Sequence, residues 1–318
     1  MRKIVILDAY VACSGGLSWK ELEEYGEVII YDRTAPEDVY DRCKGAFAVF
    51  TNKVVLTAEI IGKLPNLKFI GVLATGYNNV DIQAANNRGI TVCNVPAYST
   101  ESVVQTVFAH LLNIYVNAEA HSQSVKAGDW SECKDFSYLL APTEELYGKR
   151  IGIYGLGNIG KRVAEIAHAF GMTVTALTSK SQSELPEYIT KVSKEDFFSK
   201  SDIISLNAPL TADNKNFICE ETLSLMKPET VLINTARGGL IDETALDKAL
   251  RERKIFAAGL DVLCKEPPEA TNPLLTNPYC RITPHIAWQS TTARNRLIHI
   301  SAQNLKNFIE GNPQNVVK

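Results

Sequence analysis

Three polar side chains of the kinds that carry catalysis each come shortly after a short apolar run. Arg237 follows TVLIN, Glu266 follows AAGLD and His285 follows CRIT. If these runs are neighbouring parallel strands, their carboxyl ends meet at one edge of a sheet, where open sheets bind ligands. There a histidine can donate a proton and a guanidinium can bind a carboxylate. Each residue alone could be a surface or structural group, but together they predict a catalytic site.

Three glycines, Gly155, Gly157 and Gly160, form the spacing G-x-G-x-x-G after the predicted strand RIGIY. In such a turn the first glycine permits a tight bend, the second admits a pyrophosphate and the third lets a helix pack on the strand. The helix start at Asn158 and Ile159 offers free N–H groups to an anion. The pattern predicts a dinucleotide site, and the alternative is a glycine-rich turn without a ligand.

The next predicted strand ends without the acidic residue that dinucleotide-binding folds place about 20 residues further on. Thr178, Ser179 and Lys180 stand there instead. A carboxylate would accept hydrogen bonds from the ribose hydroxyls and repel a 2'-phosphate. The Lys180 ammonium can pair with a phosphate or simply remain solvated. The predicted cofactor is therefore NAD or NADP, with the preference open.

Short apolar runs alternate with helical patterns twice along the chain, which is typical of parallel sheets with crossover helices. We predict an α/β fold of two doubly wound, Rossmann-like parallel sheets. The expected strands are 4–8, 27–31, 46–50, 68–73 and 90–94 in the first sheet, and 150–154, 173–177, 202–206, 230–234, 257–261 and 280–283 in the second.

Apolar side chains at helical spacing predict a helix over residues 99–120, between the two sets of strands. Such a helix needs burial on most of its surface. It could join the two domains and line a subunit interface, or pack internally. Residues 121–149 have weak periodicity and isolated bulky side chains, as a docked arm has.

The composition excludes several classes of protein. With 45% hydrophobic residues, 22% charged residues and a formal net charge of −3, the chain reads as globular, and neither nucleic acid nor a membrane surface is expected as its partner. No run approaches the roughly 18 apolar residues of a membrane span, so we expect a cytoplasmic protein. Seven scattered cysteines without a C-x-x-C pair predict reduced thiols and no metal site.

The order of five motifs resembles that of the D-isomer-specific 2-hydroxyacid dehydrogenases over essentially the whole chain. The resemblance implies a dinucleotide-binding domain, residues 99–291, inserted in a smaller substrate domain made of residues 1–98 and 292–318. It also implies a hinge between the domains and a homodimer formed through the dinucleotide-binding domain. The motifs are GLGNIG (155–160), NAPLTADN (207–214), INTARGGLID (233–242), GLDVLCKEPP (259–268) and TPHIAW (283–288).

The resemblance also assigns roles to the residues at matching positions. His285 would donate a proton to the substrate carbonyl oxygen, Glu266 would favour the imidazolium, and Arg237 would bind the substrate carboxylate and polarise the carbonyl. Asp261 would contact the nicotinamide amide, although it could instead cap a strand end. Further substrate contacts are expected from Asn52, Lys53, Thr75 and Gly76. Further dinucleotide contacts are expected from Thr106, Ala208, Pro209, Thr235 and Ala236.

Within the family, four segments are most similar to the glycerate dehydrogenases, also called hydroxypyruvate reductases. They are YDRT (31–34), TNK (51–53), ATGYNNVD (74–81) and NVPAYSTESV (94–103). The similarity implies NAD(P)H-dependent reduction of hydroxypyruvate or glyoxylate to D-glycerate or glycolate, and the reverse reaction.

Two alternatives to this function stand beside it. The enzymatic alternative is D-3-phosphoglycerate dehydrogenase or another D-2-hydroxyacid dehydrogenase, but a phosphate would favour more cations than Lys53 and Arg237 provide. The non-catalytic alternative is an NAD(H)-sensing binding protein of the corepressor type, which the presence of Arg237, Glu266 and His285 disfavours.

Overall fold

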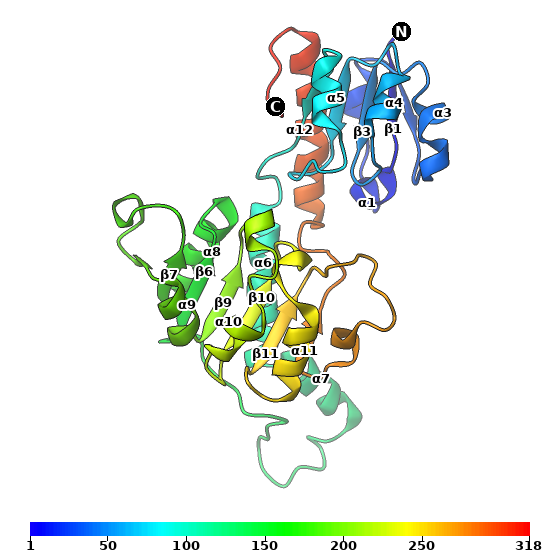
Figure 1. Ribbon diagram of the computed structural model, residues 1–318. Coiled ribbons are helices and arrows are strands. Elements are labelled where there is room, and N and C mark those ends of the chain that lie inside the picture. Colours follow the sequence, from blue (N-terminus) through cyan, green and yellow to red (C-terminus); the bar gives the residue numbers. More distant parts are fainter. The chain divides into compact units, whose positions relative to one another are not determined.

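Two parallel sheets with helices on both faces build this chain, which confirms the predicted pair of doubly wound α/β units (Figure 1). The computed structural model describes residues 1–318. It divides into unit 1, Met1–Ser99 with Trp288–Lys318, and unit 2, Thr100–Ala287. The second division lies earlier than the expected residue 292, because the Trp288 ring packs edge-on against Tyr98 of unit 1, with centroids 6.2 Å apart.

Unit 1 contains five strands in the order β2-β1-β3-β4-β5, all parallel. Ile4 and Ile6 point to one face and Val5 and Leu7 to the other, as the two-residue period of a strand requires. Because both faces of the sheet are covered, the central strands β1, β3 and β4 are almost entirely buried and mostly apolar, whereas the edge strand β2 is exposed at both of its ends. The strands are β1 Lys3–Ile6, β2 Glu27–Ile30, β3 Ala48–Thr51, β4 Phe69–Val72 and β5 Thr91–Cys93.

Helices α1 Ala9–Cys13, α2 Lys20–Glu23 and α12 Thr291–Ile309 cover one face of this sheet. The other face carries α3 Val39–Cys43, α4 Ala58–Gly62 and α5 Ile82–Asn87. Figure 1 shows α12, in red and orange, beside the blue N-terminal strands. The last helix of the chain therefore completes the core of the first unit.

Unit 2 contains seven parallel strands in the order β12-β11-β10-β9-β6-β7-β8. The order reverses at β6, which lies between β9 and β7, so the turn after β6 is the switch point at which open sheets bind ligands. The strands are β6 Arg150–Tyr154, β7 Thr173–Leu177, β8 Ile189–Lys191, β9 Ile203–Leu206, β10 Val231–Asn234, β11 Ala257–Leu260 and β12 Cys280–Ile282.

Helices α6 Thr100–Tyr115 and α8 Asn158–Ala169 cover one face of the second sheet. Helices α9 Lys194–Lys200, α10 Glu220–Ser224 and α11 Glu243–Arg251 cover the other. The apolar side of α6 packs in the core of its own unit, which is the internal packing that the sequence left as an alternative. None of the helices combines the length and the apolar composition needed to cross a membrane.

Two local predictions were wrong. The expected helix over 99–120 ends at Tyr115, because Asn117 adopts a left-handed conformation with φ of 52°, and a separate helix α7, Ala118–Ala127, takes up the start of the expected arm. The edge strand β8 was missed. It has three residues, of which Ile189 alone is buried, so it lacks the apolar run of the other strands.

Candidate active site

The glycine turn after β6 has the close packing that its spacing predicts. Gly155 has a φ of +86°, and a Cβ there would lie 2.7 Å from the backbone of Ala208. A Cβ on Gly160 would lie 2.1 Å from the Gly155 carbonyl oxygen. The turn therefore contacts both the loop after β9 and the start of α8, and only glycine fits at these two positions.

The open side of this turn suits a dinucleotide. A Cβ on Gly157 would meet no atom within 4 Å, and the first N–H groups of α8, from Asn158 and Ile159 onward, follow it. Two buried polar atoms, Asn207 Oδ1 after β9 and Thr235 Oγ1 after β10, have no hydrogen-bond partner. Because buried polar atoms are normally paired, the residues present fit a bound group that would satisfy them.

Lysines lie close together at the loop after β7, where dinucleotide-binding folds usually have an acidic residue and this chain has none. The Lys180 backbone N–H donates to Thr178 Oγ1 at 3.3 Å, and Lys191 Nζ donates to the Lys180 carbonyl oxygen at 2.6 Å. The neighbouring ammonium of Lys161, on α8, lowers the pKa of Lys180. Ser179 is exposed. Like charges thus lie together at the place expected for the adenosine ribose.

Arg237 lies on a turn that Asn234 holds in place. Asn234, fully buried at the end of β10, donates from Nδ2 to the Arg237 carbonyl oxygen at 2.8 Å and accepts at Oδ1 from the Ala236 N–H at 2.9 Å. The exposed guanidinium donates to the Ala236 carbonyl oxygen at 2.7 Å and has no acidic partner. It is therefore available to bind an anion.

Glu266 lies on the adjacent loop after β11. A Cβ on Gly238 would lie 2.0 Å from the Leu263 carbonyl carbon, so the turn that carries Arg237 packs directly on this loop. Glu266 Oε1 accepts from the Leu263 N–H at 3.1 Å. The loop is anchored by Glu243, whose carboxylate accepts from the Cys264 N–H at 2.6 Å and from Asn272 Nδ2 at 2.8 Å.

Glu266 and His285 form a hydrogen-bonded pair. Glu266 Oε2 lies 2.6 Å from His285 Nδ1, and the two side chains are 34% and 27% exposed. An Nδ1–H that donates to the carboxylate fixes the tautomer and the orientation of the ring. His285 itself adopts a φ of 54°, a left-handed conformation that is unfavourable for any residue with a Cβ. Surrounding contacts must therefore hold it.

Asp261 supplies those contacts from the end of β11, which is the strand-end capping considered above as its alternative role. It is 1% exposed. Its carbonyl oxygen accepts from the His285 N–H at 2.9 Å, and its carboxylate accepts from the Ile286 and Ala287 N–H groups at 2.9 and 2.8 Å. Thr283 Oγ1 donates to the same carboxylate at 2.6 Å.

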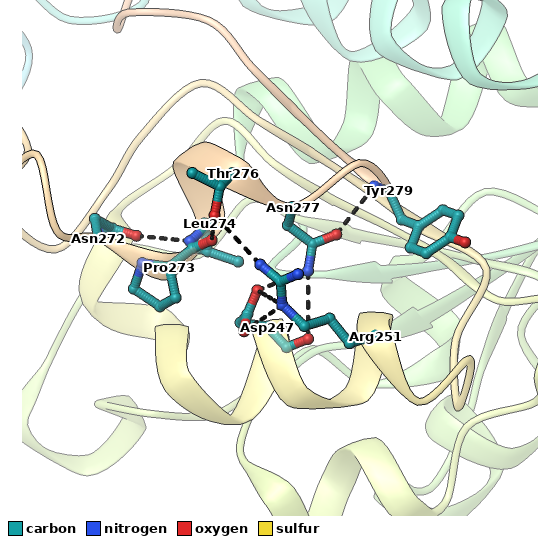
Figure 2. Close-up of polar contacts among 8 residues, drawn as sticks. All are labelled: Asp247, Arg251, Asn272, Pro273, Leu274, Thr276, Asn277 and Tyr279. Carbon is teal, nitrogen blue, oxygen red and sulfur yellow. Dashed lines mark hydrogen bonds and ion pairs between the residues drawn. The ribbon is translucent and has the colours of Figure 1, made fainter.

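A polar network between α11 and the segment before β12 fixes the start of that strand (Figure 2). Asn277, 4% exposed, donates to Asp247 Oδ1 at 2.7 Å and accepts from the Tyr279 N–H at 2.9 Å. Arg251 Nε lies 3.0 Å from both carboxylate oxygens of Asp247. The network sets where β12 begins and, three residues beyond its end, where His285 stands.

In unit 1, the predicted substrate residues lie at the carboxyl ends of the strands. Asn52 is 7% exposed, and its amide donates to the Leu73 carbonyl oxygen at 2.6 Å, so it links β3 to β4. Lys53 is exposed and lines a cavity of about 480 Å³ with Tyr10, Arg33 and Val55. Thr75 Oγ1 donates to the Val95 carbonyl oxygen at 2.9 Å, and Gly76 follows it.

Unit 2 thus brings Arg237, Glu266 and His285 to the ends of neighbouring strands, with Ala208 at the glycine turn. Thr106, on α6, donates to the Ser102 carbonyl oxygen at 3.1 Å.

The sequence did not single out Asn234, Glu243 and Asn277, the residues that hold the loops in place. Asn234 and Asn277 are buried, and Glu243 is half-buried at the start of α11, but burial is not visible in one sequence.

Comparison with known proteins gives a consistent result. Residues 108–287 match the family model for the NAD binding domain of D-isomer specific 2-hydroxyacid dehydrogenases. A hydroxypyruvate reductase of Blautia hydrogenotrophica is 42% identical over 99% of both chains. A glycerate dehydrogenase of Methylorubrum extorquens is 38% identical over 100% of this chain and 99% of its own.

A solved structure agrees. The structure of an acyclic imino acid reductase in complex with NADPH and D-Arg matches this chain with a TM-score of 0.87. The two sequences are 32% identical, and the match covers 99% of this chain and 100% of that one. The motifs, the fold and the comparisons agree, so the chain belongs to the D-isomer-specific 2-hydroxyacid dehydrogenase family.

Proposed function

We propose that this protein reduces hydroxypyruvate or glyoxylate with NAD(P)H, forming D-glycerate or glycolate, and catalyses the reverse reaction. The 2.6 Å pair of His285 and Glu266 carries the proposal, together with the exposed guanidinium of Arg237 on the adjoining turn, which has no acidic partner. The similarity to proteins named hydroxypyruvate reductase and glycerate dehydrogenase supports a small 2-keto acid as the substrate.

The side chains divide the work of the reaction. A nicotinamide dinucleotide, when bound, supplies the hydride that the keto carbon accepts. Arg237 binds the carboxylate and polarises the carbonyl, where negative charge develops. His285 Nε2 gives its proton to the carbonyl oxygen, and Glu266 keeps the ring oriented. Each turnover consumes the keto acid, NAD(P)H and a proton, and releases the hydroxy acid and NAD(P)⁺.

For the cofactor, we propose that NADPH is accepted, either in preference to NADH or beside it. No carboxylate stands at Thr178 to repel a 2'-phosphate, and the Lys161 ammonium lowers the pKa of Lys180, a shift that the Glu184 carboxylate opposes only in part. A bound phosphate would relieve that repulsion. The NADPH complex of the imino acid reductase supports a nicotinamide dinucleotide in this fold.

We assign unit 1 as the substrate domain and unit 2 as the dinucleotide-binding domain. In unit 1 the exposed Lys53 and the turn at Thr75 and Gly76 are the proposed contacts of the substrate carboxylate, whereas Asn52 supports the turn through Leu73. In unit 2 the proposed dinucleotide contacts include Asn207, which the sequence reasoning did not single out. Asp261 has one lone pair left on Oδ2 with which it could accept a hydrogen bond from a nicotinamide amide.

We also propose a homodimer in which a second copy covers the segment after α7. This segment, residues 128–149, extends away from the sheet of unit 2 (Figure 1), and Trp130, Phe136 and Leu139 on it are 52%, 91% and 65% exposed. Such an apolar surface needs a partner. Light scattering should give twice the chain mass for the wild type, and the single-chain mass for Phe136→Asp. A monomeric wild type would refute the proposal.

The decisive assay is the initial rate of hydroxypyruvate reduction with NADH and, separately, with NADPH, each titrated to saturation. We expect turnover with NADPH, and for Lys180→Ala a loss on the order of 10-fold in kcat/KM for NADPH but not for NADH. An equal loss with both cofactors, or a clear preference of the wild type for NADH, would remove the proposed phosphate site. No turnover of hydroxypyruvate or glyoxylate with either cofactor would refute the proposed substrate.

A further inference from the structure

One buried histidine lies outside the residues assigned to the reaction. His110 is 5% exposed, in the middle of α6. A Cβ on Gly259 would lie 2.8 Å from the His110 Cβ, so the imidazole is set directly against β11. Its Nε2 lies 3.1 Å from Thr283 Oγ1. A polar ring in this position replaces apolar packing and needs an explanation.

The proton on each of these atoms can be assigned. Thr283 has one hydroxyl proton, and its oxygen lies 2.6 Å from Asp261 Oδ1, a carboxylate oxygen that only accepts. The hydroxyl therefore donates to Asp261 and accepts from His110 Nε2–H. This arrangement places a proton on Nε2 of His110. Burial lowers the pKa of His110, with Asp261 opposing the shift, which favours the neutral ring.

The chain of hydrogen bonds ends at the loop that carries His285. Asp261 holds the N–H groups of His285, Ile286 and Ala287. Helix α6 reaches this loop a second time, because Ser102 Oγ donates to the Ala287 carbonyl oxygen at 2.5 Å. Helix α6 thus fixes both ends of the segment 283–287, within which His285 adopts its left-handed conformation.

We propose that His110 is a positioning residue for His285, acting through Thr283 and Asp261. It orients the Thr283 hydroxyl toward Asp261, and Asp261 in turn holds the backbone on both sides of His285. The inference rests on the proposed function only in that His285 is the proton donor. The geometry of the segment 283–287 is a separate observable.

The test compares His110→Leu, which removes the donor, with His110→Gln, whose amide can donate to Thr283. A matched control is His121→Leu, because His121 bonds only the Asn117 carbonyl oxygen and the Leu140 N–H. Misplacing a catalytic group by a small distance costs up to about 100-fold, so we expect kcat of His110→Leu to fall roughly 10-fold with little change in KM. His110→Gln should retain most of the wild-type kcat, and His121→Leu should keep all of it.

Two further measurements separate positioning from general stability. In the double variant His110→Leu/Thr283→Val, kcat should equal that of Thr283→Val alone, because His110 acts through that hydroxyl. Amide hydrogen exchange at 283–287 should be faster in His110→Leu than in the wild type and unchanged in His121→Leu. If His110→Leu does not fold, His110→Met takes its place.

An unchanged kcat and exchange rate in the donor-free variant, or losses that multiply in the double variant, would overturn the inference. The exchange measurement requires no substrate. A wild type without turnover would therefore refute the proposed function while exchange still decides whether His110 positions the loop.

Discussion

Replacing Thr235 by valine tests whether the unpaired hydroxyl after β10 belongs to a cofactor site. Thr235 is 9% exposed, and its Oγ1 has no partner in the protein. Leaving a buried polar group unpaired costs about 1–3 kcal/mol. A methyl group of similar shape should therefore raise the free energy of unfolding of the cofactor-free protein by about 1 kcal/mol. If the hydroxyl bonds the dinucleotide, the same change should weaken NAD(P)H binding by roughly 3- to 10-fold.

Thr175→Val is the matched control. Thr175 is 4% exposed in β7 of the same sheet, but its hydroxyl donates to the Ile151 carbonyl oxygen at 3.1 Å. Losing this hydrogen bond should lower the free energy of unfolding by about 1 kcal/mol, and cofactor binding should not change. Urea unfolding and NAD(P)H fluorescence titration measure the two quantities. If both valine variants lose stability alike, or if Thr235→Val binds cofactor like the wild type, the assignment of this hydroxyl to the site is wrong.

Three further outcomes follow from the site. Glu266→Gln keeps the shape of the side chain but removes the charge-assisted bond to His285, and kcat/KM for the keto acid should fall on the order of 10-fold; an unchanged value would argue against the pair. Arg237→Lys replaces a planar fork by a single ammonium, so kcat/KM should fall on the order of 100-fold while the dissociation constant of NAD(P)H is unchanged. Burial lowers the pKa of His110 below its usual value, so the unfolded chain binds a proton that the folded chain does not, and stability should decrease as the pH falls below about 6.5. His110→Gln should flatten this decrease in urea unfolding, and an identical slope in both proteins would contradict it.

The strands of both sheets were predictable because parallel strands are buried on two faces and read as continuous apolar runs. The run IVILD shares three residues with β1, and TVLIN contains β10. Strand β8 was not predictable in this way, because an edge strand with a single buried residue has no continuous run of apolar residues. The end of α6 at Tyr115 was not predicted either, because the chain turns at Asn117 and no glycine or proline marks the turn in the sequence.

The placement of Arg237, Glu266 and His285 at one edge of the sheet was predictable from their positions after strands, because neighbouring parallel strands end at the same edge. Their roles in a reaction stay a prediction. The choice between two roles for Asp261 was not predictable, since it depends on which N–H groups the loop presents to its carboxylate. The unpaired Asn207 Oδ1 was equally hidden, because it becomes visible only when every neighbour has been placed.

His110 shows where local pattern stops being informative. In a helical projection it falls on the buried side of α6 with Val103, Val107 and Leu111, and on that pattern alone it would count as a tolerated core residue. Its partner Thr283 is 173 residues away in sequence. Only the packing of α6 on β11, at a glycine that admits the ring, brings the two together. An apolar side chain at position 110 would satisfy the same helical pattern and leave the Thr283 hydroxyl without its donor. The hydrogen bond between His110 and Thr283 therefore depends on the tertiary fold, and helical periodicity alone cannot predict it.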